Sequence, residues 1–340
     1  MYRVQAPALI RMRLLFGSSI SEEFCSEQCN YINEVNYVRK ASQLSQPLRL
    51  GISGSSFAYV MPKELVSAAY ANAQSLKPQK FDDRQNALMA DFMRNMMRTA
   101  NSMQISAMEC YHSVCWDNEP ILDVMLENPN VEFWSVHAPY GKFADPSSPD
   151  PAIRKNSIAS FTDAINVGTR LGAKVIVSHP GAQSEYDMPK QQRMELSADT
   201  LAQVADIAGE HGLKIAVEPL PKQEVGCSLD EVLWIIGKID RPNVGINFDV
   251  NHLFPPENIP ALIRNAGKLI LSMHISDQDG QERHWLPFQG TLDWQAIIET
   301  LTEIGYTGPL MYETHIKEAQ TCDDVGRAVV DNYKRLISLA

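Results

Sequence analysis

The sequence predicts an α/β fold, a (β/α)8 TIM barrel with an N-terminal extension. Short apolar runs with the length and composition of buried parallel strands recur from residue 48 onward, and helix-like segments alternate with them. Four of these runs, all in the second half of the chain, end on a side chain that can hold a divalent metal. Because the carboxyl ends of barrel strands converge on one face, these four side chains are expected to meet there.

The strands and helices can be assigned in order along the chain. The eight predicted strands are 48–52, 105–109, 131–137, 174–179, 214–218, 244–249, 269–274 and 310–313. Helices with an apolar face are predicted at 62–75, 85–101, 192–211 and 229–239, with others around 158–165, after the seventh strand and at the end of the chain. No helix range is predicted after the second or the sixth strand.

Polar residues mark the starts of three of these helices. Residues 228–231 form a capping-box pattern that opens the helix 229–239. Asp293 is predicted to cap the helix after the seventh strand, and Asp323 or Thr321 the last helix.

Residues 48–340 are predicted to form one barrel domain, and residues 1–47 an extension in front of it. A chain of 340 residues with 44% hydrophobic content suits one barrel with insertions better than two small domains. The first 20 residues carry three arginines and no acidic residue, as targeting segments do, but arginine and Pro7 interrupt the apolar positions. A poorly packed extension is therefore the preferred interpretation.

The charge and the cysteines limit the partners and the compartment. The net charge of −11 and the pI near 5.2 argue against nucleic acid and against an anionic membrane, since both favour a basic surface. No apolar stretch approaches about 18 residues, so no membrane span is expected. The six cysteines show no small-disulfide framework, which indicates reduced thiols and a cytoplasmic location.

The four metal-binding side chains are spaced by about one strand–helix unit. They are Glu218, Asp249, His274 and Glu313, separated by 31, 25 and 39 residues. Two glutamates, one aspartate and one histidine make a mixed oxygen and nitrogen site for one divalent ion, Mn²⁺, Mg²⁺, Co²⁺ or Zn²⁺. One acidic strand end would mean little, but four in succession predict a metal site.

Further histidines belong to the same rim of the barrel. Those at a strand end, one turn beyond it or in the following loop are His137, His179, His252 and His284. A lone histidine is more often structural than functional, but chance would scatter histidines over the helices as well. These four are predicted to contact substrate, whereas His112 and His315 stay ambiguous. Aromatic side chains that could stack on a sugar are Phe57, Trp116 and Trp134.

The chain resembles the sugar phosphate isomerase/epimerase superfamily, the xylose isomerase-like barrels, over residues 48 to 338. The segments that carry the resemblance are 136–140, 178–181, 216–219, 247–252, 274–277, 284–294 and 311–315. They include the sequences Val-His-Ala-Pro-Tyr, Ser-His-Pro-Gly, Ala-Val-Glu-Pro and Asn-Phe-Asp-Val-Asn-His. The combination is specific for the superfamily and much less so for the reaction.

The resemblance implies roles for individual residues. One divalent ion, with Mn²⁺ preferred, would be held by the four strand-end side chains named above. His252 would contact substrate, and the family's basic residue after the seventh strand maps onto Arg283 or His284. Where the family usually has Gly-Glu-Gly, this chain has Phe-Gln-Gly at 288–290.

The residue types also suggest a mechanism. A metal chelated by a ketose carbonyl and the neighbouring hydroxyl acidifies the C–H between them and stabilises the enediolate. Glu218 and Glu313 are predicted to be the catalytic carboxylates, each coordinating through one oxygen and presenting the other to a substrate proton. Alternatively, both are ligands alone and a histidine or water moves the protons, because ligation lowers the basicity of a carboxylate.

Several functional classes remain open. The first is a sugar isomerase or 3-epimerase acting on a small-molecule ketose or keto-sugar. The second is a lyase or dehydratase acting on an inosose or keto-glycoside through the same site. The third is a phosphodiesterase that resembles the three-zinc apurinic endonucleases, for which Glu282 and His284 offer an acidic-x-His pair, although the acidic charge argues against it. A sugar-binding protein without turnover would not explain two carboxylates at the metal.

Two further expectations concern the substrate and the assembly. No glycine-rich phosphate loop is evident after the seventh or eighth strand, so an unphosphorylated sugar is slightly favoured. The resemblance is compatible with a homo-oligomer, although nothing in the sequence identifies an interface.

Overall fold

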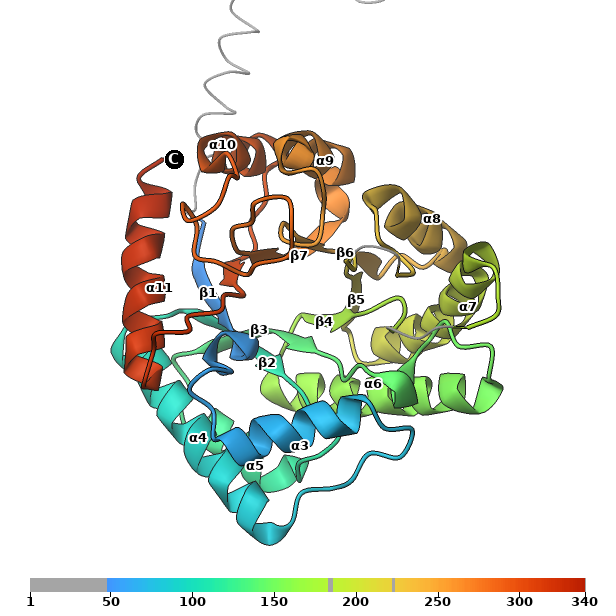
Figure 1. The fold of residues 1–340 in the computed structure, drawn as a ribbon, viewed down its shortest axis with the longest axis horizontal. Helices are drawn as coiled ribbons and strands as arrows, with labels where there is room; N and C mark the ends of the chain where they lie inside the picture. Colours follow the sequence, from blue (N-terminus) through green and yellow to red (C-terminus); the bar gives the residue numbers. More distant parts are fainter. Residues whose placement is uncertain (1–47, 183–185, 222–223, 340) are drawn as a thin grey trace, which may run out of the picture. The chain divides into compact units, whose positions relative to one another are not determined.

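A closed barrel of eight parallel strands, paired in sequence order, forms the centre of the molecule (Figure 1). The computed structural model describes residues 48–182, 186–221 and 224–339. The strands are β1 (Leu50–Ser53), β2 (Ala107–Tyr111), β3 (Glu132–His137), β4 (Val175–Ser178), β5 (Lys214–Val217), β6 (Val244–Asp249), β7 (Ile270–Ile275) and β8 (Leu310–Tyr312). The predicted fold class is thus confirmed, while the expectations for residues 1–47 lie outside the described residues.

Helices surround the strands as an outer ring (Figure 1). Those described are α3 (Lys63–Ala73), α4 (Asp83–Ser102), α5 (Asn118–Leu126), α6 (Pro151–Leu171), α7 (Lys190–Glu210), α8 (Leu229–Ile239), α9 (Ile259–Ala266), α10 (Trp294–Ile304) and α11 (Cys322–Ile337). No residue range was predicted for α5 or α9. Both are short and carry a proline in the first turn, where the missing N–H has no intrahelical partner to lose.

The helix starts agree in part with the expected caps. Asp293 caps α10, and Thr321 rather than Asp323 caps α11, where Thr321 and Asp324 form a reciprocal capping box. Ser228 accepts a hydrogen bond from the backbone N–H of Glu231, as predicted. The carboxylate of Glu231, however, accepts from the backbone N–H groups of residues 226 and 227, so only half of the predicted box forms.

The position of β2 differs from the prediction in a way that matters for the site. The strand begins at Ala107 rather than at residue 105 and continues to Tyr111. Glu109 therefore lies within the strand, opposite Ser53 of β1 and Ser135 of β3. These three polar side chains are fully buried and form hydrogen bonds inside the barrel, beneath the carboxyl ends of the strands.

The remaining barrel is held together by apolar packing. Most side chains of the strands are buried, as expected for parallel strands covered by helices on one side and filled by side chains on the other. Gly245 of β6 shows how closely the layers approach, because a Cβ there would lie 2.4 Å from the carbonyl oxygen of Leu269. Among the described helices, none is long and apolar enough to cross a bilayer.

Candidate metal and substrate site

Four consecutive strands bring the predicted metal ligands together. Glu218 follows β5, Asp249 ends β6, His274 lies in β7 and Glu313 follows β8. One potential ligand atom from each lies within 4.8 Å of those of the other three. The Nδ1 atom of His274 is 3.1 Å from Glu218 Oε1 and 2.9 Å from Glu313 Oε2. The strand-end pattern in the sequence therefore corresponds to one compact cluster.

The electrostatics of this cluster favour a positive charge at its centre. Burial alone would raise the pKa of the Glu218 and Glu313 carboxyls, but His274 holds both pKa values well below their ordinary range. Burial alone would lower the pKa of His274, yet Glu109, Glu313 and Glu218 raise it well above its ordinary value. Three carboxylates buried around one point are costly unless a cation compensates them.

Asp249 provides the test of whether these residues fit a metal. Burial raises the pKa of its carboxyl to about 7, and Oδ2 has no hydrogen-bond partner among the described residues. His252 Nδ1 is 3.1 Å from this oxygen, but its hydrogen bond goes to the carbonyl oxygen of Pro219 at 2.9 Å. A buried carboxylate oxygen left in this way has the chemistry of a cation ligand, so the donor set fits a divalent ion.

Glu109 is a functional candidate that the sequence reasoning did not single out. Its carboxylate accepts hydrogen bonds from Ser53 Oγ and Ser135 Oγ, both at 2.8 Å, and its Oε2 lies 3.1 Å from His274 Nε2. A carboxylate on the outer nitrogen of a metal-binding histidine fixes the ring and directs the other nitrogen inward. The available signal was the position of Glu109 as the acidic last residue of the predicted strand 105–109.

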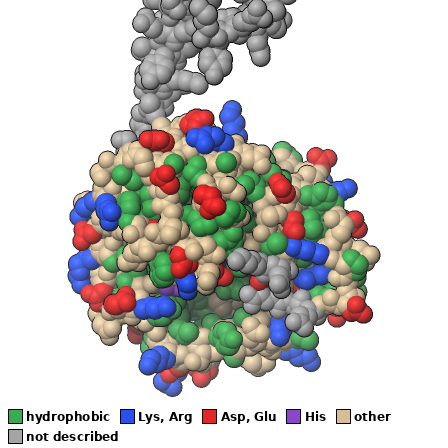
Figure 2. Space-filling view, turned by 45° about the horizontal axis from the view of Figure 1, so that its top comes forward, with side chains coloured by type: hydrophobic (Ala, Val, Ile, Leu, Met, Phe, Trp, Pro, Cys, Tyr) green, Lys and Arg blue, Asp and Glu red, His purple; other side chains and the backbone are tan. Residues whose placement is uncertain are grey.

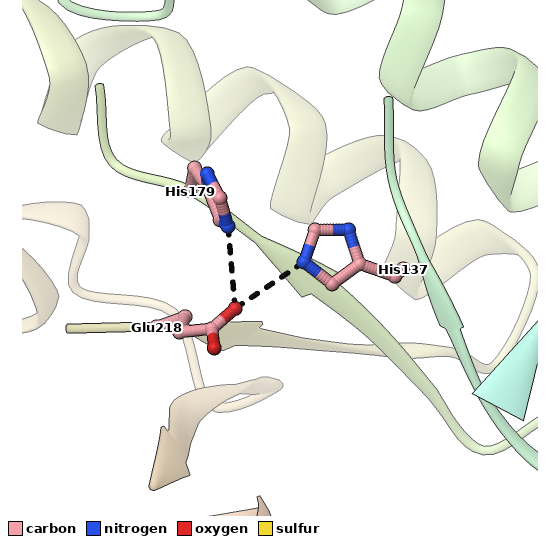
Figure 3. A group of neighbouring side chains, drawn as sticks. All are labelled: His137, His179 and Glu218. Carbon is pink, nitrogen blue, oxygen red and sulfur yellow. Dashed lines mark hydrogen bonds and ion pairs between the residues drawn. The ribbon is translucent and has the colours of Figure 1, made fainter. Parts of the chain in front are cut away.

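A second group of ligand-type side chains shares Glu218 with the first (Figure 3). His137 ends β3 and His179 follows β4. The Nε2 atoms of both lie 3.3 Å from Glu218 Oε2, the oxygen that does not face His274. The two oxygens of Glu218 thus face two different sets of histidines.

A third group comprises His252, Glu282 and His284. Glu282 Oε1 lies 3.3 Å from His284 Nε2 and 3.8 Å from His252 Nε2. These contacts hold the pKa of Glu282 well below its ordinary range. Burial would lower the pKa of His252, but Asp249, Glu282 and Glu218 raise it to about 10.

Three of these histidines are oriented in the same way. The Nδ1 atoms of His137, His252 and His284 lie within hydrogen-bonding distance of backbone carbonyl oxygens, at 2.9, 2.9 and 3.2 Å. Donating from Nδ1 fixes each ring and leaves Nε2 directed at a carboxylate. This arrangement prepares an imidazole to bind a metal or to exchange a proton.

A cavity of about 550 Å³ opens above the three groups (Figure 2). Glu218, Glu313 and the histidines of the second and third groups line it, whereas Asp249 and His274 lie beneath its wall. His112 and His315, which were ambiguous in the sequence, also line the cavity. Trp116 does so as well, with its indole N–H donating to His112 Nδ1 at 2.8 Å.

Three residues proposed from the sequence lie elsewhere. Arg283 forms an ion pair with Asp279 and its guanidinium lies over the ring of Trp285, so His284 rather than Arg283 occupies the cavity wall. Phe57 is fully buried in the core. The ring of Trp134 lies under the guanidinium of Arg49, away from the cavity lining.

The sequence of the chain matches a known family of barrels. The family profile for xylose isomerase-like TIM barrels matches residues 121–329, which is more than half of the chain. The chain belongs to this family. The class is therefore a xylose isomerase-like TIM barrel, and the names of the relatives give examples of the reactions within it.

Two curated relatives illustrate that range. Inosose isomerase of Bacillus subtilis (strain 168) is 30% identical over 196 residues, covering 52% of this chain and 69% of that protein. D-psicose 3-epimerase of Ruminiclostridium cellulolyticum is 28% identical over 185 residues, covering 52% of this chain and 61% of that protein. The chain thus spans about two thirds of the length of the curated relatives that it matches.

Solved structures support the fold over a larger part of the chain. The crystal structure of IOLI protein with a binding zinc atom has a TM-score of 0.65 and 17% sequence identity, and it covers 86% of this chain and 98% of that chain. At this level of identity, the similarity concerns the fold alone.

Proposed function

We propose that this protein is a divalent-metal-dependent sugar isomerase or epimerase that acts on a ketose or keto-sugar. The observation that carries the proposal is the pair of carboxylates, Glu218 and Glu313, on either side of His274 Nδ1 at the edge of the cavity. Two carboxylates at one metal position suit removal and return of a proton next to a carbonyl. The inosose isomerase and D-psicose 3-epimerase relatives support this reaction class.

The metal would be held by Glu218, Asp249, His274 and Glu313. Three of the four ligands are carboxylates and none is a thiol, so Mn²⁺ is preferred, with Mg²⁺, Co²⁺ or Zn²⁺ as alternatives. When bound, such an ion supplies Lewis acidity that polarises a substrate carbonyl.

The protein's own side chains would handle the proton. Glu218 has one oxygen facing His274 and the other facing His137 and His179, so the second oxygen can take up a proton and pass it to an imidazole. Glu313 uses Oε2 toward His274, while Oε1 accepts a hydrogen bond from Ser55 Oγ at 3.0 Å. Glu218 is therefore the better base in this geometry, and Glu313 the second acid/base group.

Deuterium incorporation tests the reaction. The metal-loaded protein is incubated in D₂O with D-psicose, D-fructose or an inosose, and the products are analysed by NMR and mass spectrometry. We expect one deuterium at the carbon next to the carbonyl and an isomeric product of unchanged composition. Release of a leaving group or water would instead identify the lyase reaction, and no exchange with any keto-sugar would contradict the proposal.

A second candidate is a phosphodiesterase that uses several metal ions. The observation that favours it is the set of three ligand groups around one cavity, two of which share Glu218. The net charge of −11 disfavours a nucleic-acid substrate. Metal analysis of protein purified without added metal separates the two candidates: one ion per chain supports the isomerase, whereas three zinc ions with cleavage of abasic-site DNA support the phosphodiesterase.

A further inference from the structure

The cavity extends well beyond the ligand groups, into a region that we call the apolar arm. The arm lies between α3, α4 and the segment after β2, and it is bounded by Leu65, Ala69, Met89, Phe92, Met93 and Trp116. The whole cavity, of about 550 Å³, has the size of sites that hold drug-sized ligands. A free monosaccharide at the carboxylate end would leave the arm unfilled.

One face of α4 supplies much of the arm. Met89, Phe92, Met93 and Met96 follow the spacing i, i+3, i+4, i+7, so their side chains share a face of the helix. All four line the cavity and are nearly fully buried. Methionine adapts its shape to a neighbour and makes favourable contacts with aromatic rings.

The arm offers few hydrogen bonds to a sugar. None of the described lining residues from α3 and α4 is charged. The amide of Asn72 is already used, because its Oδ1 accepts from Gln79 N and its Nδ2 donates to Gln79 O and Cys115 Sγ. The indole N–H of Trp116 is bound to His112. A hydroxyl placed in this arm would lose its hydrogen bonds to water without replacement.

Exposed side chains of the cavity lining include large apolar ones, beside the charged Lys142 and Glu282. Val66, Tyr70 and Tyr140 line the cavity, and they are exposed large hydrophobic side chains, at 39%, 71% and 41% of their surface. Figure 2 shows hydrophobic side chains around the hollow. Exposed apolar groups at the edge of a cavity are typical of a site that binds an apolar ligand group.

We propose that the substrate is amphipathic: a carbonyl-bearing polyol at the carboxylates, joined to an apolar group of about the size of one aromatic ring that occupies the apolar arm. The identity of the polyol end rests on the proposed function, whereas the apolar group rests on the lining of the arm. An aryl glycoside of a keto-sugar has this chemistry. A small, fully hydroxylated ketose would use only one end of the cavity.

Binding of matched glycosides tests the apolar arm without requiring turnover. Methyl and phenyl β-D-glucopyranoside are titrated by calorimetry into the metal-loaded protein, since they carry the same sugar and differ only in the apolar group. We expect the phenyl glycoside to bind roughly tenfold to a hundredfold more tightly, as burial of several apolar carbons implies. Equal affinity for the two glycosides in the wild-type protein would overturn the proposal, whatever the variants do.

Two matched substitutions on α3 locate the effect. Ala69 lines the arm, whereas Ala71 is exposed on the same helix and is absent from the cavity wall. Ala69→Trp should fill the arm and abolish the advantage of the phenyl glycoside while leaving binding of the methyl glycoside within about twofold. Ala71→Trp should leave both affinities unchanged. An undiminished phenyl advantage in folded Ala69→Trp would contradict the assignment.

The outcome is separable from that of the proposed function. A phenyl preference in protein that exchanges no deuterium would support the arm and reject the isomerase reaction. Deuterium exchange with ketoses but no phenyl preference would support the isomerase reaction and reject the proposed role of the arm. Folding of each variant is checked by circular dichroism and thermal unfolding before the titrations.

Discussion

The two ends of the cavity are built by different means. The carboxylate end is formed by consecutive strand ends, so the register of a closed barrel sets the relative positions of its charged groups. The apolar arm is formed by one face of α4 together with α3, where side chains of similar volume could replace one another. The barrel strands thus fix the positions of the charged groups, whereas α3 and α4 determine the shape of the apolar arm.

The two ends should also contribute differently to stability. Buried carboxylates without a compensating cation destabilise the folded state, whereas buried apolar side chains stabilise it. Substitutions at the carboxylate end should above all reduce metal binding and activity. Substitutions in the arm should reduce stability and change substrate preference. The following predictions test this contrast.

Removing the metal should have the largest effect. Treatment with a chelator is expected to abolish activity, and Mn²⁺, Co²⁺ or Mg²⁺ should restore it, because the donor set is mostly oxygen. His274→Ala should lose metal and activity together, as measured by metal analysis and turnover. His252→Ala should weaken turnover while most of the metal stays bound. Full turnover in metal-free protein would refute the central assignment.

Replacing either catalytic carboxylate should have the next largest effect. Glu218→Gln and Glu313→Gln are each expected to lower turnover on the order of 10²–10⁴-fold, since glutamine keeps a ligating oxygen but cannot accept the proton. If both variants bind metal and exchange deuterium at the wild-type rate, the two glutamates are ligands alone.

A substitution in the arm should show the opposite pattern. Phe92→Ala is expected to reduce the free energy of unfolding by about 3 kcal/mol, near the low end for a buried phenylalanine because the side chain borders an existing cavity. Metal content and deuterium exchange with a small ketose should stay close to wild-type values. Chemical denaturation and metal analysis measure the two effects, and loss of metal in the folded variant would argue against independent ends.

Glu109→Gln tests whether the contact of Glu109 with Nε2 orients the ring of His274 for metal binding. Because Glu109 holds His274 through Nε2, the variant is expected to bind the metal roughly 10- to 100-fold more weakly. Glu132→Gln is the matched control, since Glu132 lies on the neighbouring strand β3 but pairs with Arg49 outside the site. Equal metal affinity of the wild type and Glu109→Gln would show that the contact is structural only.

The sequence predicted the carboxylate end better than the arm, for a physical reason. A parallel barrel brings strand ends to one face whatever the details of packing, so Glu218, Asp249, His274 and Glu313 could be grouped in advance. Their binding of a metal stays a prediction. Glu109 was missed because its role depends on side chains from three other strands.

Loop conformation and helix packing could be predicted less well from the sequence. Of the adjacent pair after β7, His284 has a positive φ of 54° and faces the cavity, while Arg283 turns to Asp279. No residue pattern fixed that choice. The methionine-rich face of α4 has the periodicity of ordinary core packing, so its contribution to a cavity became visible only in the structure.

The smallest predicted effect concerns His112, a histidine of the cavity lining. Its Nδ1 accepts from the indole N–H of Trp116, so its Nε2–H donates to Asp163 Oδ2 at 2.9 Å, and the neutral ring satisfies both contacts. Burial lowers the pKa of His112, against the opposing effect of Asp163.

The lowered pKa of His112 should make the stability of the folded protein depend on pH. Below the unfolded-state pKa of about 6.5, the unfolded chain binds a proton at His112 that the folded protein does not, so stability falls as the pH drops toward the lower folded-state pKa. His112→Gln should remove this contribution. Denaturation of both proteins between about pH 7.5 and 5.5, about one unit either side of the unfolded-state pKa, would show it as a smaller pH dependence of the variant. A pH dependence equal to that of the wild type would mean that the protonation of His112 does not differ between the folded and unfolded states.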